Sequence, residues 1–270
     1  MKEKLVSLII STKNEKLNIK NLLLSIKKQT YKFIEIIVVD NNSIDETKEI
    51  AKKYTGLVFN KGPERSAQRN FGAKNAKGAY LLFLDADMIL EKDVVRECVE
   101  IIQSLKIAGV IIPEKSIGKG FWGRVKAFER SFYVGDESIE AARFFEKKVF
   151  WEYGGYDENI TGPEDWDISQ KVKSKHKLKR IKSFIIHNEG ESKLFDFIKK
   201  KYYYGKGSAA YIKNYPLRLT GTQVIYLLRP AFYKNWKRMI KRPILTCGII
   251  LLLALEQAAG FFGFLRGQLR

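Results

Sequence analysis

Short apolar segments with strand character alternate with amphipathic segments of helical periodicity over the first half of this 270-residue chain. Such alternation is typical of α/β folds, in which helices cover both faces of a mostly parallel sheet. The expected strands are Leu5–Ser11, Ile34–Asp40, Leu57–Asn60, Tyr80–Asp85 and Ala108–Ile112, and the expected helices are Leu17–Lys28, Glu46–Tyr54, Ser66–Ala76 and Asp93–Leu105. We therefore predict a mostly parallel sheet flanked by helices in this part of the chain.

Charge is distributed unevenly between the two ends of the chain, whose formal net charge is +19. Residues 1–170 carry 27 Lys and Arg against 26 Asp and Glu, whereas residues 171–270 carry 22 against 4. A strongly basic region indicates contact with nucleic acid or with an anionic membrane surface. We predict an α/β domain over residues 1–190 and a basic, apolar helical region over residues 191–270.

The cysteines and the first apolar run bear on the cellular compartment. Leu5–Ile10 is shorter than the apolar core of a signal peptide and leads directly into a strand pattern. Cys98 and Cys247 lie in separate apolar settings, without the spacing of a disulfide framework or a zinc site. We therefore expect a reducing, cytoplasmic environment.

The segment Ile244–Leu265 is mostly apolar and is as long as a membrane-spanning helix of about 20 residues. Glu256 and Gln257 interrupt it, so an embedded hairpin or an interfacial helix competes with a simple span. A buried helix of a soluble protein and a dimer contact are further alternatives. Basic and aromatic flanking residues such as Trp236 and Arg266 favour a membrane. We expect the chain to lie at the cytoplasmic face of the membrane, peripheral or partly embedded through residues 220–270.

Polar side chains follow several of the expected strands at the points where the strands end. Asp85 and Asp87 follow a buried strand, and two acids separated by one residue can bind Mg²⁺ or Mn²⁺ together with a phosphate. The carboxyl ends of parallel strands meet at the edge where α/β sheets bind ligands. The other polar side chains expected at this edge are Thr12, Asn14, Glu15, Asp40, Arg65 and Arg69.

A second group of polar residues lies further along the chain. Glu164 and Asp165 follow a Gly-Pro turn and are expected at the start of a helix, where the helix dipole favours ionised carboxylates. These acids either carry chemistry or simply cap the helix. Trp166 either contacts a ligand through its ring or packs in the core. His187 follows a strand-like run, and a core histidine with a satisfied ring is one reading of it.

Four motifs follow one another along the chain: L-I-I-S-T-K-N-E, I-I-V-V-D-N-N-S-I-D-E-T, R-S-A-Q-R-N-F-G-A-K-N-A-K-G-A-Y-L-L-F-L-D-A-D and G-G-Y-D-E-N-I-T-G-P-E-D-W-D. Taken together they resemble the family 2 glycosyltransferases, over roughly residues 4–190. The resemblance implies a Rossmann-like, GT-A-type fold. It also implies a metal-dependent enzyme that moves one sugar, with inversion, from a nucleotide-diphosphate sugar to a hydroxyl group.

The resemblance implies two sets of site residues. The residues expected to bind the nucleotide sugar are Thr12, Asn14, Glu15, Asp40, Arg65, Arg69, Asp85 and Trp166. Asp85, Asp87 and His187 are expected at the metal, Asp165 as the catalytic base, and Glu164 beside it to position the acceptor. Asn41 replaces an Asp that is frequent in the family, which leaves recognition of the base open.

The expected partners are a UDP-sugar donor with Mn²⁺ or Mg²⁺ as cofactor, and a lipid-linked or other glycan acceptor presented at a membrane. A homodimer is also expected as an option, and nucleic acid is not expected as a partner. The chain has no Q-x-x-R-W motif, the mark of processive synthases in this family, so single additions are favoured.

Three other functions fit the sequence less well. Transfer onto a polyprenyl phosphate is disfavoured by Met88–Leu90, which departs from the corresponding pattern of dolichyl-phosphate mannose synthases. Nucleic-acid binding through Lys171–Lys182 and Tyr202–Tyr204 leaves the apolar Ile244–Leu265 unexplained. A sugar-phosphate nucleotidyltransferase would need a glycine-rich loop after the first strand, and Ser11–Glu15 contains no glycine.

Overall fold

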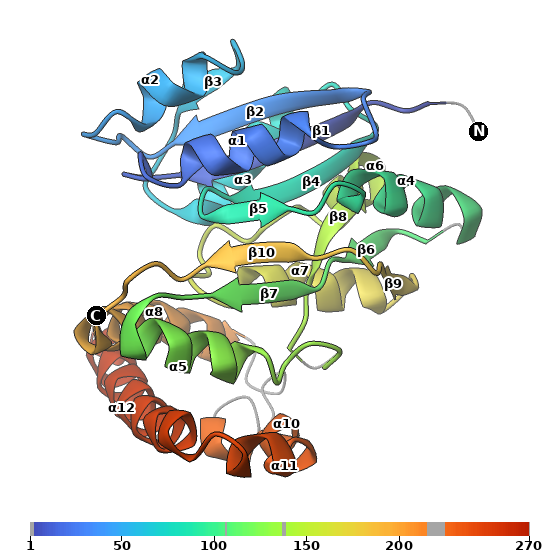
Figure 1. The fold of residues 1–270 in the computed structure, drawn as a ribbon. Helices are drawn as coiled ribbons and strands as arrows, with labels where there is room; N and C mark the ends of the chain where they lie inside the picture. The colour runs from blue at the N-terminus through green and yellow to red at the C-terminus, as the bar shows by residue number, and fades with distance from the viewer. Residues whose placement is uncertain (1–2, 106, 137–138, 215–224, 270) are drawn as a thin grey trace. The chain divides into compact units, whose positions relative to one another are not determined.

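The computed structural model describes residues 3–105, 107–136, 139–214 and 225–269. The chain forms two compact units (Figure 1). Unit 1 consists of Met1–Glu114, Glu137–Glu158 and Glu164–Asn188, and unit 2 consists of Lys115–Asp136, Asn159–Pro163 and Glu189–Arg270. Each unit is therefore built from more than one stretch of chain, and the domain division near residue 190 stays a prediction.

Unit 1 is built on a seven-stranded sheet with the strand order β3-β2-β1-β4-β8-β6-β9. Its strands are β1 (Val6–Thr12), β2 (Ile34–Asp40), β3 (Val58–Asn60), β4 (Tyr80–Asp85), β6 (Gly109–Ile111), β8 (Ala142–Glu146) and β9 (Leu178–Arg180). The first four of these in sequence pair in parallel, and β8 runs antiparallel to both β4 and β6. The predicted mostly parallel sheet is thus confirmed.

Helices cover both faces of this sheet, and every residue of the central strand β1 is buried. On β1, Leu8 and Ile10 belong to one buried core and Ile9 belongs to another. The helices of unit 1 are α1 (Ile19–Lys27), α2 (Thr47–Lys52), α3 (Arg65–Asn75), α4 (Val94–Leu105), α6 (Lys147–Glu152) and α7 (Glu164–Lys173) (Figure 1). Both faces of each central strand are apolar because both faces are covered.

The nine predicted elements all have an observed counterpart whose ends lie within two residues of the prediction. The strand-like run before His187 is also present, as β10 (Ile185–Asn188). β10 pairs antiparallel with β5 (Met88–Leu90), and this pairing places His187 opposite Met88. This short pairing brings the end of the Asp85–Asp87 segment next to a segment about 100 residues further along the chain.

Unit 2 is largely helical. It contains most of β7 (Glu114–Ile117), together with α5 (Gly120–Arg130), α8 (Leu194–Asn214), η1 (Tyr226–Leu228), α10 (Pro230–Lys234), α11 (Trp236–Ile240) and α12 (Pro243–Gln268). α12 packs along α8 and against α5. Gly205 of α8 and Gly263 of α12 allow this close approach, because a Cβ atom at either position would clash with a carbonyl oxygen of the facing helix.

α12 has two contrasting sides. One side is buried and contributes Ile249, Leu252 and Leu253 to the core of unit 2. The other side exposes large apolar residues: Ile244, Ile250, Leu251, Phe261, Phe262 and Leu265. By length and composition α12 could cross a membrane, and among the described residues it is the helix that meets this test.

The buried side of α12 also carries the acid that interrupts its apolar sequence. Glu256 is 2% exposed, and its Oε1 lies 3.0 Å from the Lys126 Nζ of α5. The same ammonium lies 3.1 Å from the Glu129 Oε2. We refer to Lys126, Glu129 and Glu256 as the lysine network. Because Glu256 faces this network, it is satisfied within unit 2 and does not need to face lipid.

Candidate active site

The carboxyl ends of β1, β2 and β4 meet at one edge of the sheet of unit 1. The register places Thr12 opposite Asp40 and Ser11 opposite Asp85. The Ser11 hydroxyl donates a hydrogen bond of 3.1 Å to Asp85 Oδ1. Parallel pairing therefore brings together the polar strand ends that the sequence pointed to.

Hydrogen bonds join the loop after β2 to the loop after β1. Asp40 is fully buried, and its Oδ1 accepts a 2.7 Å hydrogen bond from the Ser43 backbone N–H. The Asn14 backbone N–H in turn donates to Ser43 Oγ at 2.7 Å. Asn14 has a φ of 54°, a left-handed conformation that asparagine tolerates better than most residues. Asp40 and Asn14 are thus coupled through Ser43, a residue that sequence reasoning missed although it follows Asp40 closely.

Two other predicted residues lie in the loop after β1. The Glu15 backbone N–H donates to the Thr47 hydroxyl at 2.8 Å, and its carboxylate accepts a 2.8 Å bond from the Asn18 side chain. Thr12 is buried, and its Oγ1 has no hydrogen-bond partner among the described residues. A buried hydroxyl without a partner is costly, so it indicates a site that a polar ligand atom can complete.

Arg69 of α3 connects the end of β4 to the start of α7. Its guanidinium is fully buried, and its Nη2 lies 2.8 Å from Asp85 Oδ1. Its Nη1 bonds to Asp165 and lies 3.3 Å from Glu164 Oε1. One guanidinium therefore holds the two acidic segments of the candidate site together.

Arg65 lies one helical turn before Arg69, on the same face of α3. Its Nη2 lies 2.6 Å from Glu164 Oε1, and its Nη1 lies 4.0 Å from Asp85 Oδ2. Its side chain is 32% exposed, whereas that of Arg69 is fully buried. Of the two predicted arginines, Arg65 is therefore the one that an anionic ligand can reach without displacing a buried ion pair.

Sequence reasoning missed Arg143 of β8 and Glu114. The Arg143 Nε lies 2.6 Å from Glu114 Oε1, and its Nη2 lies 3.9 Å from Asp165 Oδ2. Its Nη1 lies 3.7 Å from Asp85 Oδ2. A charged residue inside the apolar run Ala141–Phe145 is the signal that could have revealed it. We refer to Arg65, Arg69, Arg143, Asp85, Glu164 and Asp165 as the arginine cluster.

Burial and the arginines act in opposite directions on the acids of the arginine cluster. Burial disfavours ionisation of Asp85, but Arg69, Arg65 and Arg143 outweigh it and hold the pKa of Asp85 well below its usual range. Burial raises the pKa of Glu164 above its usual range, although Arg65 opposes the shift. Environments that push the pKa values of nearby acids apart are typical of sites that carry out acid–base chemistry.

Asp87 and His187 form a separate pair beside this cluster. The His187 Nε2 lies 3.0 Å from Asp87 Oδ2, and its Nδ1 lies 3.5 Å from Glu114 Oε2. The other Asp87 oxygen, Oδ1, is buried without a hydrogen-bond partner in the described part of the chain. An orphaned carboxylate oxygen beside an imidazole nitrogen fits Mn²⁺ or Mg²⁺, which need few protein ligands when a phosphate supplies the rest.

The predicted metal ligands do not form one three-residue group in the described part of the chain. Among the described residues, no group of three or more His, Cys, Asp and Glu side chains is arranged to hold a metal ion. The oxygens of Asp85 already face Ser11, Arg69 and two further arginines. Of the three predicted metal ligands, Asp87 and His187 are therefore the two that are best placed to bind a metal ion.

α7 presents the remaining predicted residues. It begins at Glu164, so Glu164 and Asp165 occupy its first turn, and Trp166 follows them in a half-buried position. Asp165 is 21% exposed at its side chain, whereas Glu164 is 1% exposed. Asp165 can thus reach a ligand, while Glu164 is enclosed by arginines.

Comparison with known sequences finds a family match. The family model described as glycosyl transferase family 2 matches residues 7–161. The chain is 40% identical over 91 residues to glycosyltransferase AglE of Haloferax volcanii, which covers 30% of each chain. It is 32% identical over 94 residues to the putative glycosyltransferase EpsH of Bacillus subtilis, covering 33% of this chain and 27% of EpsH. The matched regions therefore span less than a third of these relatives.

Solved structures share the fold over nearly the whole chain. The mannosyltransferase PcManGT of Pyrobaculum calidifontis, in complex with GDP-Man and Mn²⁺, aligns with a TM-score of 0.61 and 18% identity. That alignment covers 96% of this chain and 74% of PcManGT. TarS 1-349 of S. aureus, in complex with UDP-GlcNAc, aligns with a TM-score of 0.57 and 17% identity, covering 96% and 89% of the two chains. At these identities the likeness concerns the fold, which is of the GT-A type.

Proposed function

The chain belongs to glycosyl transferase family 2, and from this premise we propose that it moves one sugar from a nucleotide-diphosphate sugar to an acceptor hydroxyl with inversion. The observation that carries the proposal is the position of Arg69, which joins the Asp85 strand end to the acids of α7. The Arg69 guanidinium therefore contacts both Asp85 on the donor side and Asp165 on the acceptor side. A single displacement needs that proximity, because donor and base must flank the same sugar carbon.

We assign the acceptor side of the reaction to α7. Asp165 accepts the proton of the acceptor hydroxyl, since its carboxylate is partly exposed and sits in the first turn of the helix, where the dipole stabilises an anion. Glu164, which is buried against Arg65 and Arg69, is assigned to position the acceptor. Trp166 is assigned to sugar contact.

We assign the donor side to the edge of β1, β2 and β4. Thr12, Asn14, Glu15 and Asp40 form the nucleotide pocket, and Asp85 binds the ribose or the sugar. Arg65 faces the diphosphate because its guanidinium is the partly exposed one. Mn²⁺ or Mg²⁺ bound by Asp87 and His187 would supply positive charge to the departing diphosphate.

The donor is proposed to be a UDP-sugar. Solved relatives in fold are complexes with UDP-GlcNAc and with GDP-Man, so both nucleotides enter the test. Calorimetric titration of UDP, GDP and their sugars with and without Mn²⁺ is expected to find metal-dependent binding of one nucleotide to the wild type and its loss in Asp87→Ala. The matched control is Asp93→Ala, an acid bonded to Thr30 and Arg96 outside the site. Absence of binding by every nucleotide would overturn the proposal.

The acceptor is proposed to be a lipid-linked glycan reached from the cytoplasmic face of a membrane. The outward side of α12 exposes apolar residues along the helix, while its other side is held by the core of unit 2 and by Glu256. A helix anchored on one side and apolar on the other suits an interfacial position better than a full span. The basic residues before it suit an anionic surface.

Flotation with lipid vesicles tests the membrane assignment. Phe261→Ser with Phe262→Ser is expected to lower vesicle binding, because each ring is more than half exposed on the outward side. The control pair Leu17→Ser and Phe33→Ser removes two exposed apolar side chains of unit 1. Equal binding of both variants would contradict the assignment. Conversion of a wild-type dimer to a monomer by the α12 pair alone, without a change in flotation, would assign this surface to self-association instead.

A further inference from the structure

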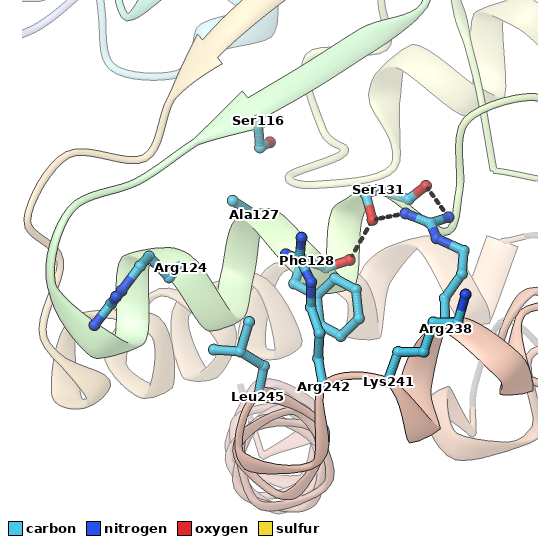
Figure 2. Close-up of a pocket in the computed structure, with 9 residues that line it drawn as sticks. All are labelled: Ser116, Arg124, Ala127, Phe128, Ser131, Arg238, Lys241, Arg242 and Leu245. Atoms are coloured by element: carbon cyan, nitrogen blue, oxygen red, sulfur yellow. Dashed lines mark hydrogen bonds between the residues drawn. The ribbon is translucent and has the colours of Figure 1, made fainter.

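Unit 2 contains a pocket that the proposed transfer reaction does not use. Its volume is about 480 Å³ (Figure 2). Its lining comes from β7, α5, α11 and the start of α12, and consists of Ser116, Arg124, Ala127, Phe128, Ser131, Arg238, Lys241, Arg242 and Leu245. Four of these nine residues are cations and none is an acid.

The cations of the pocket are not neutralised by carboxylates. Within the described ranges, Arg124, Arg238, Lys241 and Arg242 form no ion pair. Arg238 donates a 2.8 Å hydrogen bond to Ser131 Oγ and a longer one to the Ser131 carbonyl. The Arg242 guanidinium lies over the Phe128 ring, 5.4 Å from its centroid. These neutral contacts orient the guanidinium groups while leaving their charge uncompensated.

The cations are concentrated on one side of the pocket. Figure 2 shows Arg238, Lys241 and Arg242 extending from one side toward Phe128 of α5 and Ser131 directly after it, while Arg124 lies toward the other end of the same helix. Phosphate oxygens are the ligands that such a group of guanidinium and ammonium donors recognises best. The Ser131 hydroxyl donates to the Phe128 carbonyl at 2.7 Å and accepts from Arg238 at 2.8 Å, so it holds that guanidinium in place.

The other part of the lining is apolar and continues onto α12. Ala127, Phe128 and Leu245 line the pocket, and the outward side of α12 begins next to Leu245 with Ile244, which is 74% exposed. A free inorganic anion gains nothing from such an apolar continuation. A molecule with a phosphate at one end and hydrocarbon at the other gains from both.

We propose that this pocket binds the phosphate headgroup of an anionic membrane lipid, with the lipid chains directed along the outward side of α12. This inference rests on the proposed membrane association, and it adds a specific headgroup site to a surface that would otherwise attract lipid by charge alone. The pocket would set how unit 2 lies on the bilayer.

The test compares two pairs of substitutions that remove the same charge from adjacent helices. Arg238→Gln with Lys241→Gln removes two pocket cations, and Lys234→Gln with Lys237→Gln removes two that do not line the pocket. The probe is flotation with vesicles of an equal mixture of phosphatidylcholine and phosphatidylglycerol. Charge alone predicts equal losses, since each surface cation contributes similarly. A headgroup site predicts that the pocket pair loses about tenfold more affinity than the control pair.

Each outcome decides the proposal. Equal losses in the two pairs, or no loss in the pocket pair, would overturn it. Binding of glycerol 3-phosphate to the wild type as tight as binding to the vesicles would assign the pocket to a soluble phosphate compound instead. Competition by single-stranded RNA that the pocket pair abolishes, without a difference in flotation, would assign it to nucleic acid.

Two controls separate failure here from failure of the proposed reaction. Melting temperatures of both pairs establish that unit 2 is folded, and the substitutions are at exposed positions where little change is expected. Nucleotide binding by calorimetry is expected to be unchanged in both pairs. Asp87→Ala is expected to lose nucleotide binding and keep full vesicle binding, so the two proposals fail independently.

Discussion

The arginine cluster of unit 1 and the lysine network of unit 2 both bury ionised side chains, but they differ in how far they are closed to solvent. In the lysine network, Lys126 is 9% exposed and Glu129 and Glu256 are each 2% exposed. In the arginine cluster the buried Arg69 and Glu164 are continuous with Arg65 and Asp165, which are 32% and 21% exposed. The three members of the lysine network are nearly closed to solvent, with Lys201, 27% exposed, 3.9 Å from Glu256 Oε2 at its edge. The arginine cluster has two of its own members partly exposed and is open along one side.

This difference separates a structural use of buried charge from a chemical one. In a closed network, the free-energy cost of removing the ions from water is offset only by the contacts within the network. Loss of any partner is therefore costly. In an open cluster, the buried ions fix the geometry of the site. The partly exposed ions can exchange a protein partner for a ligand. We therefore expect substitutions in the lysine network to affect stability, and substitutions at the open side of the arginine cluster to affect catalysis.

The largest expected effect is on catalysis and comes from Asp165→Asn. Loss of the proposed base is expected to lower kcat by about 10²–10⁴-fold. Donor affinity is expected to change little, because the amide keeps the shape of the side chain. The melting temperature is expected to fall, because the buried Arg69 loses a carboxylate partner. Asp167→Asn serves as the control, since Asp167 pairs with Lys171 on the same helix and outside the cluster. A kcat that survives in Asp165→Asn would remove Asp165 from the base role.

The largest expected loss of stability comes from Lys126→Met. The substitution leaves Glu129 and Glu256 buried without their shared cation, and breaking a buried pair in this way costs about 3–5 kcal/mol of unfolding free energy. Urea unfolding measures the loss. Lys119→Met, at an exposed position of the same unit, is expected to stay within about 0.5 kcal/mol of the wild type. Similar stability of the two variants would show that the lysine network is not closed in solution.

A smaller effect is expected at the open side of the arginine cluster. Arg65→Gln removes a charged hydrogen-bonding group, and is expected to raise the KM for the donor by about tenfold or more. The matched substitution Arg69→Gln is expected to lower stability instead, because it leaves three carboxylates without the buried guanidinium that joins them. Equal changes in KM and in melting temperature in the two variants would contradict the assignment of Arg65 to donor binding and of Arg69 to stability.

The smallest effect concerns the pH dependence of stability, which is expected to have opposite signs for Glu129 of the lysine network and Glu164 of the arginine cluster. Burial opposes ionisation of Glu129, but Lys126 and Tyr133 outweigh it and lower the pKa of its carboxyl. Its stabilising contribution is therefore present above the unfolded pKa of about 4.3 and is lost as the pH falls through the lower folded value. Burial raises the pKa of Glu164, so its contribution is present in acid and is lost as the pH rises through the folded value.

Melting temperatures recorded between about pH 3 and about pH 7 check these signs. The wild type is expected to exceed Glu129→Gln most at neutral pH, and the gap is expected to close in acid. For Glu164→Gln, the variant is expected to gain on the wild type as the pH rises. Parallel curves for the wild type and either variant would show that the carboxyl in question has the same pKa in the folded and unfolded states.

Local sequence predicted much of unit 1. The strands could be predicted because each is an apolar run, buried on both faces, that stops at polar residues. The helices between them could be predicted from their clear amphipathic periodicity. The start of α7 was predicted for a similar local reason, since Gly162-Pro163 precedes two acids that suit a first helical turn. The short antiparallel strand β8 was not predicted, because its five residues carry no periodicity that separates them from an apolar helix.

The sequence alone determined the family motifs, the parallel part of the sheet and the acidic strand end at Asp85 and Asp87. Tertiary structure decided which charges meet. Arg69 contacts acids that are 16, 95 and 96 positions away, and Lys126 contacts one that is 130 positions away. Such pairs depend on strand order and helix packing, which bring remote segments together and set how much water remains around them. Local sequence patterns do not predict these pairings. Only the folded chain therefore distinguishes the open arginine cluster from the more closed lysine network.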